Sequence, residues 1–152
     1  MSSKKLIKEI QHFFNYLFPI ERSLTGKGNR QTLEFVRNLV PLNILEIPSG
    51  KKVYDWKTPK EWELVSAELF TEKGKLILST KESNLHVLNF SDPYSGLVSY
   101  EELSKHLYSN KDLPDAVPYV TSYYKNNWGL CISHNKRKKL NIIVVSSAMS
   151  GT

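Results

Sequence analysis

Four histidines and one cysteine are the side chains of this sequence most able to hold a catalytic metal or to act as a nucleophile. The histidines are His12, His86, His106 and His134, and the cysteine is Cys131. A catalytic zinc ion needs three protein ligands, usually histidines with a carboxylate, and an open position for water. No two of these histidines have the spacing of a ligand pair on a helix or in a turn. The pattern therefore indicates no metal site and no catalytic residue, and we expect His12, His86 and His106 to be structural.

Cys131 and His134 are close enough in sequence to be considered as a nucleophile and its base. Residues three apart on one strand point to opposite faces, which argues against contact between the thiol and the imidazole. We therefore favour a buried Cys131 that packs as a small hydrophobic residue, with His134 making a local hydrogen bond. A lone cysteine cannot form an internal disulfide, which fits a reducing compartment, and we expect a cytoplasmic protein.

Aromatic side chains before His134 suggest a binding surface. Tyr123, Tyr124 and Trp128 lie around the basic Lys125, an arrangement that can stack on sugars or bases. Together with His134, these three aromatic residues form the candidate binding surface. Alternating aromatic residues of a strand can equally belong to a protein core, and the sequence alone leaves both interpretations open.

Nucleic-acid binding through a basic run at 136–139 is a weaker alternative, and we expect no membrane partner. The chain has 21 basic and 15 acidic side chains, a formal net charge of +6, and four consecutive basic residues at 136–139. A solvated surface run is the favoured interpretation of these four residues over a phosphate site. The stretch TGKGN at 25–29 lacks the full pattern of a phosphate-binding loop. No apolar run approaches the roughly 18 residues that a membrane-spanning helix needs.

Two amphipathic helices are predicted at the start of the chain. The first ends before Pro19, and a second begins after Gly26 and Gly28 with Asn29 as its cap and stops at Pro41. The apolar residues of the first helix recur at helical spacing: Leu6, Ile10, Phe13, Phe14 and Leu17.

Short strands are predicted next. Residues 61–70 alternate imperfectly, as a strand with one bulged residue would. Lys73 and Gly74 predict a hairpin turn into a second strand at 75–80. A third strand is predicted at 85–90, so this region indicates a small antiparallel sheet.

The remainder of the chain predicts one more helix and several strands. Ser99 and Glu102 have the spacing of a capping box, in which each side chain satisfies the other's main-chain amide. Residues 119–124 and 128–134 are predicted as two strands. The last segment, 141–152, opens like a buried strand and then ends.

These elements predict an α+β protein, with two amino-terminal amphipathic helices followed by a mostly antiparallel β-rich domain that contains one further helix. We expect three regions. Residues 1–45 hold the helices, residues 46–140 form the β-rich domain, and residues 141–152 are an atypical or truncated tail.

Several stretches carry a resemblance to one bacterial family. The chain is similar to aminopeptidase-like proteins often associated with polysaccharide-biosynthesis loci, which resemble zinc exopeptidases and carry an inserted domain of unknown function. The matching stretches are RSLTGKGNRQTLEFV at 22–36, IPSGKKVYDWKTPKEW at 47–62, SNLHVLNFSDPYSG at 83–96 and PDAVPYVTSYYKNNWGLCISHNKRKKL at 114–140.

The resemblance implies an exopeptidase-like domain interrupted by a β-rich insertion and followed, in complete members, by a winged helix. The metal-binding stretch of the family, a His-Pro pair with later Asp and Glu ligands, lies downstream of the matching region. No segment of this sequence matches that stretch. We therefore expect no cofactor in this chain, with zinc only in complete members of the family.

The resemblance thus predicts an amino-terminal fragment of an aminopeptidase-like metallohydrolase that is inactive by itself. Its partner would be the missing carboxy-terminal half of the same architecture. Without that half, apolar helix stripes would favour self-association. The alternative is a non-catalytic binding module for a glycan, a peptide or a partner protein.

Overall fold

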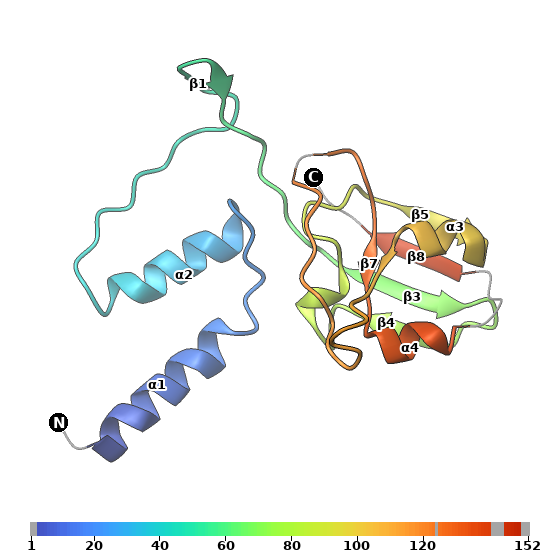
Figure 1. Ribbon diagram of the computed structural model, residues 1–152. Coiled ribbons are helices and arrows are strands. Elements are labelled where there is room, and N and C mark those ends of the chain that lie inside the picture. Colours follow the sequence, from blue (N-terminus) through green and yellow to red (C-terminus); the bar gives the residue numbers. More distant parts are fainter. Residues whose placement is uncertain (1–2, 124, 141–144, 150–152) are drawn as a thin grey trace. The chain divides into compact units, whose positions relative to one another are not determined.

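The computed structural model describes residues 3–123, 125–140 and 145–149 (Figure 1). The chain divides into two compact units, which we call the helical unit (Met1–Glu63) and the β-rich unit (Leu64–Thr152). The α+β class expected from the sequence is confirmed. The three regions expected from the sequence, 1–45, 46–140 and 141–152, stay predictions.

The helical unit begins with two helices, α1 (Ser3–Leu17) and α2 (Lys27–Arg37). Helix α1 ends where the sequence predicts, just before Pro19. The predicted cap of the second helix is wrong, because Gly26 with φ 102° precedes the first turn and Asn29 lies inside it. Glycine adopts this left-handed conformation without steric cost. The amide of Asn29 instead donates to the main-chain oxygen of Ser23 in the loop before the helix.

Aromatic contacts join the two helices. The ring of Phe35 stacks on Tyr16 at 4.6 Å between centroids and meets Phe13 edge-on at 5.6 Å. No described residue of either helix is buried. The helix pair therefore leaves many apolar side chains exposed, among them Leu6, Ile7, Ile10, Phe14, Phe18, Leu33, Leu39 and Val40.

The rest of the helical unit is a short hairpin and an ion pair. Strand β1 (Lys52–Val53) pairs antiparallel with β2 (Trp56–Lys57). Further along, the guanidinium of Arg30 donates two hydrogen bonds to the carboxylate of Glu61, at 2.5 and 2.7 Å. This bidentate pair connects α2 to the end of the unit and lowers the pKa of Glu61.

A four-stranded antiparallel sheet forms one part of the β-rich unit. Its order is β4 (Leu76–Ser79), β3 (Ala67–Thr71), β8 (Val145–Met149) and β5 (Ser95–Val98). The predicted hairpin turn is confirmed, with Gly74 at φ 76°. The phase change that suggested a bulge falls before β3 begins at Ala67, and the register shift of β3 against β4 lies further along, between Leu69 and Phe70.

The strand predicted at 61–70 is shorter than expected, because pairing starts only at Ala67. The strand-like opening of the last segment corresponds to β8 for residues 145–149. Its remaining residues, 141–144 and 150–152, lie outside the described part.

The hydrophobic core lies in the β-rich unit, which holds every buried apolar side chain of the described residues. Strand β6 (Leu107–Tyr108) pairs in parallel with β7 (Leu130–Cys131), and the leucines of both strands belong to this core. The largest fully buried side chains are Leu69, Leu78, Leu88, Leu103, Leu107, Leu130 and Ile132.

Three predicted strands of this unit are wrong in part. Residues 84–86 form a short 3-10 helix, η1 (Asn84–His86), and residues 87–89 contribute only isolated bridges. In the segment 119–124, Thr121 makes a single bridge. In the segment 128–134, pairing is limited to β7.

Local side-chain hydrogen bonds explain two of these differences. The hydroxyl of Ser83 accepts from the amide of Leu85 and starts η1. The hydroxyl of Ser133 likewise accepts from the amide of Lys136 and starts the helix α4 (His134–Lys138). Serine caps of this kind compete with strand pairing.

Candidate functional site

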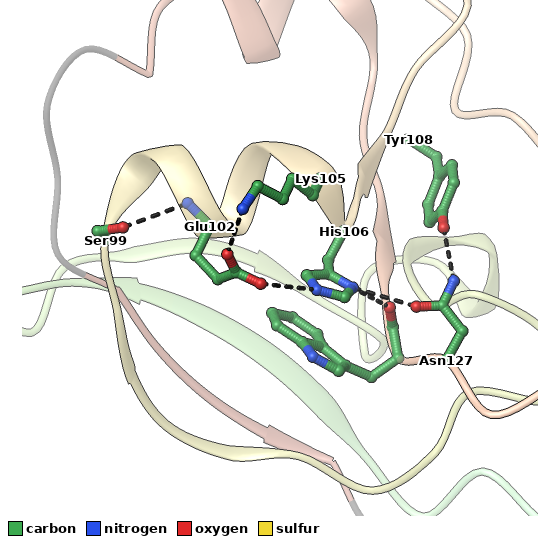
Figure 2. A network of polar contacts seen from close by, with 7 residues as sticks. Ser99, Glu102, Lys105, His106, Tyr108 and Asn127 are labelled. Atoms are coloured by element: carbon green, nitrogen blue, oxygen red, sulfur yellow. Dashed lines mark hydrogen bonds and ion pairs between the residues drawn. The ribbon is translucent and has the colours of Figure 1, made fainter.

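The helix α3 (Tyr100–Lys105) positions the main polar cluster of the β-rich unit. As predicted, the hydroxyl of Ser99 accepts from the amide of Glu102, at 3.2 Å. The other half of the predicted capping box is absent, because the carboxylate of Glu102 points along the helix instead. It accepts from Lys105 Nζ at 2.7 Å and contacts His106 Nε2 at 3.3 Å (Figure 2). The hydrogen bond from Lys105, followed by that from His106, lowers the pKa of Glu102.

The imidazole of His106 meets an oxygen at each ring nitrogen. Nδ1 lies 2.8 Å from the main-chain oxygen of Trp128 and 3.2 Å from Oδ1 of Asn127, while Nε2 faces Glu102 (Figure 2). A carbonyl oxygen only accepts, so Nδ1 donates to the main-chain oxygen of Trp128. Each ring nitrogen of His106 therefore already has an oxygen of the chain as its neighbour.

The indole of Trp128 is enclosed by two other rings. Tyr94 stacks on it with centroids 4.2 Å apart, and the imidazole of His106 stacks on it at 4.0 Å. The rings of Tyr94 and His106 would overlap each other if both stacked on the same face of the indole at these distances. They therefore cover opposite faces of the indole. Neither face of this indole remains available to stack on a sugar or a base.

Asn127 and Gly129 complete this cluster on either side of Trp128. The amide nitrogen of Asn127 donates to the hydroxyl of Tyr108 at 2.8 Å (Figure 2). A Cβ atom on Gly129 would lie 2.6 Å from a ring carbon of Tyr108 and 2.9 Å from the main-chain oxygen of His106. The chain can approach these groups here because residue 129 has no side chain.

A second polar cluster joins β6 to α4. The hydroxyl of Ser109 lies 3.0 Å from Nδ1 of His134. Arg137 donates to the main-chain oxygen of Leu107, to that of Ser104 at 3.1 Å, and to Ser109 Oγ at 3.5 Å. Desolvation lowers the pKa of the half-buried His134, and nearby positive charges lower it further.

Two of the predicted binding residues belong to different clusters. Trp128 lies in the first cluster, around His106, and His134 lies in the second, with Ser109 and Arg137. Tyr123 is 61% exposed and has a left-handed backbone, with φ 44°. Tyr124 lies outside the described residues. His134 makes a hydrogen bond with Ser109, but the partner is distant in the sequence, so the local hydrogen bond expected for His134 is not the one observed.

Two further candidate residues for chemistry, His86 and Cys131, are buried, whereas His12 lies exposed on α1. Nδ1 of His86 donates to the main-chain oxygen of Cys131 at 2.8 Å, and both residues are buried. The expected burial of Cys131 is confirmed, and burial raises the pKa of its thiol to about 12. Within residues 3–123, 125–140 and 145–149, no three His, Cys, Asp or Glu side chains are grouped to hold a metal ion.

None of the helices among the described residues combines the length and the apolar character that crossing a lipid bilayer requires.

Comparison with protein families identifies the β-rich unit. Residues 61–143, more than half of the chain, match the family described as Domain of unknown function (DUF2172). The chain belongs to the DUF2172 family. This match includes both polar clusters, so α3, β6, β7 and α4 are all parts of the DUF2172 region.

Relatives of this DUF2172 protein are much longer. A curated Clostridium acetobutylicum protein, named as a candidate polysaccharide biosynthesis protein with an aminopeptidase-like domain, is 40% identical over 149 residues. A crystal structure of a candidate peptidase from that organism matches with a TM-score of 0.89 and 39% identity. Each match covers 95% of this chain and 34% of the relative, so the chain spans about a third of their length. The resemblance to aminopeptidase-like proteins is confirmed.

Sequence reasoning missed three members of the first cluster, Tyr94, Glu102 and His106, as partners of Trp128. One signal was available, because Glu102 and His106 have the i, i+4 spacing of neighbours on a helix. Tyr94 lies 34 positions before Trp128, and no local pattern in the DUF2172 sequence indicates that their rings stack.

Proposed function

We propose that this chain is the amino-terminal part of an aminopeptidase-like metallohydrolase and that residues outside the chain hold the catalytic zinc. The observation that carries the proposal is the match to a relative named for an aminopeptidase-like domain, of which this chain spans about a third. A zinc hydrolase needs a ligand cage, because only a bound ion lowers the pKa of water enough to make it a nucleophile near neutral pH.

The contacts of the described histidines support a non-catalytic role for the β-rich unit. Both ring nitrogens of His106 are engaged, and Nδ1 of His86 is bonded to the chain in the core. The unit has its own hydrophobic core, which suits an inserted module that folds around itself. We therefore assign peptide-bond cleavage to the polypeptide that follows in the longer relatives.

The exposed apolar faces of the helical unit also support the proposal. Helices α1 and α2 bury no described residue, although both are strongly amphipathic. An apolar helix face is stable when another layer of structure covers it. In the proposed whole protein, the carboxy-terminal polypeptide is the partner that covers it. A cytoplasmic location stays a prediction.

The test is metal analysis and an aminopeptidase assay of this chain beside the full-length Clostridium acetobutylicum relative. Each protein is loaded with zinc, desalted, and assayed with amino-acid p-nitroanilides. We expect the relative to retain zinc and this chain to retain none and to give no turnover. Stoichiometric zinc with turnover in the isolated chain would overturn the proposal. A full-length relative that retains no zinc would contradict the metallohydrolase assignment.

A further inference from the structure

A hydroxyl–imidazole pair, Ser109 and His134, lies among positively charged side chains. His134 is the first residue of α4, and Lys138 lies one turn later on the same face. Lys111 follows Ser109 by two residues. The charges that lower the pKa of His134 are those of Lys138, Lys111 and Arg137, and none of them is a carboxylate. The electrostatic environment of this imidazole is therefore positive.

The guanidinium of Arg137 keeps its charge beside the pair. Its hydrogen bonds go to the main-chain oxygens of Leu107 and Ser104 and to the hydroxyl of Ser109, all of which are uncharged. Uncharged acceptors fix the position of a guanidinium without cancelling its charge. Arg137 thus positions Ser109 and adds to the positive potential.

The two lysines are exposed and are not neutralised by an acid. Within the described part of the chain, neither Lys111 nor Lys138 forms an ion pair with a carboxylate. The neighbouring Asp115 accepts a hydrogen bond from the amide of Asn135 at 2.7 Å. The lysine ammonium groups are therefore available to an anion from solution.

The contact between Ser109 and a neutral His134 leaves one of their hydrogens unused. If the hydroxyl of Ser109 donates to Nδ1 of a neutral His134, the ring hydrogen is on Nε2 and is not used in this contact. If Nδ1 donates to Ser109 instead, the hydroxyl hydrogen is free. In both tautomers the pair retains a donor in addition to the lysine charges.

We propose that Ser109, His134, Lys111 and Lys138 bind the phosphate group of a phosphate monoester. A phosphate dianion has three acceptor oxygens and suits several separate cations and donors, whereas it offers little to an apolar surface. This site goes beyond the proposed function, because it concerns recognition of an anion and needs neither zinc nor peptide cleavage.

The experiment is an NMR titration of the ¹⁵N-labelled chain in a phosphate-free buffer of low ionic strength. Inorganic phosphate and glucose 1-phosphate are the probes, glucose is the uncharged control, and the imidazole signals of His134 are followed. We expect saturable shifts with both phosphates at millimolar concentrations and none with glucose. Similar affinities for the two probes show that phosphate alone is recognised, and tighter binding of the ester shows that the sugar also contributes.

Matched variants locate the site on one face of α4. Lys138→Gln should weaken phosphate binding about fivefold, as expected for one exposed charge at an anion. Lys136→Gln removes the same charge from the same helix two residues after His134, on another face, and should leave the affinity unchanged. Both lysines are exposed, and the remaining amide signals report whether each variant is folded.

Three results would overturn this proposal. The first is a linear response that sodium chloride reproduces at the same ionic strength. The second is equal affinity in Lys138→Gln and in the unmodified chain. The third is that a single-stranded oligonucleotide binds tightly while both phosphate probes fail, which would assign the surface to nucleic acid. None of these results bears on zinc or turnover, so failure here is distinguishable from failure of the proposed hydrolase assignment.

Discussion

His106 contacts Trp128 twice, by stacking its imidazole on the indole and by donating from Nδ1 to the main-chain oxygen of the same residue (Figure 2). The side chain of His106 thus fixes both the ring and the main chain of Trp128. Since His106 follows α3 and Trp128 precedes β7, these contacts attach the loop before β7 to the end of the helix. The cluster is therefore a structural connection in the DUF2172 region rather than an open stacking platform.

Replacing His106 by alanine should destabilise the β-rich unit. The change uncovers one face of Trp128 and leaves its main-chain oxygen without this donor, so we expect a loss of about 2 kcal/mol in the free energy of unfolding. Urea denaturation followed by the NMR signals of the β-rich unit measures the change. His12→Ala, at an exposed position of α1, is the matched control and should have little effect. Equal stability of the two variants would contradict a connecting role for His106.

Gly129→Ala should be more damaging, because its Cβ atom would overlap Tyr108 and the main-chain oxygen of His106. We expect a loss of about 3 kcal/mol, the upper end of the usual range for forced overpacking of a tight site. Gly74→Ala is the control, because it adds backbone strain without a steric overlap. Residue 74 has φ 76°, and no atom lies within 4 Å of the added Cβ atom. That control should cost about 1 kcal/mol. Thermal unfolding of both variants shows which one loses more stability. A smaller loss for Gly129→Ala than for Gly74→Ala would refute the packing argument.

Cys131 should resist thiol reagents until the β-rich unit unfolds. With its pKa raised to about 12 by burial, the thiolate fraction at about pH 8 is on the order of one in ten thousand. We expect no reaction with Ellman's reagent in native buffer and one reacting thiol per chain in guanidinium chloride. Rapid labelling of the native chain would show that the core around β7 opens.

The carboxylate of Glu102 should make stability depend on pH in the acidic range. Its contacts with Lys105 and His106 lower its pKa in the folded chain, so the unfolded chain binds more protons in that range. The stabilisation is present above the unfolded value near 4.5 and is lost as the pH falls through the lower folded value. Urea midpoints of the unmodified chain and of Glu102→Gln should therefore differ near neutral pH and converge in acid. Glu101→Gln, the same charge change on the adjacent residue, should show a smaller difference.

Local signals explain which parts of this fold could be predicted. The periodic apolar residues before Pro19 predicted α1, and Gly74 predicted the hairpin, because each signal acts within a few residues of its effect. Helix α4 was missed, since its charged sequence has no apolar periodicity and depends on the cap from Ser133.

The polar clusters were harder to predict than the helices. The contact of Ser109 with His134 and the stacking of Tyr94 on Trp128 join distant segments through the tertiary fold. The sequence grouped Trp128 and His134 in one candidate binding surface, and the structure shows that they belong to different clusters. Tyr123 remains a prediction as a binding residue.

Self-association through the helical unit is the last prediction. Apolar side chains of α1 such as Ile7 and Phe14, which are 65% and 64% exposed, give two copies of the chain a surface to bury. Sedimentation velocity should show a mean mass that rises with concentration, and the double variant Ile7→Ser, Phe14→Ser should shift it towards the monomer. Tyr54→Ser removes a 92% exposed aromatic residue from the turn between β1 and β2 and should leave association unchanged. A chain that is monomeric at every concentration would contradict the prediction, and an equal effect of Tyr54→Ser would show that association does not depend on the helix pair.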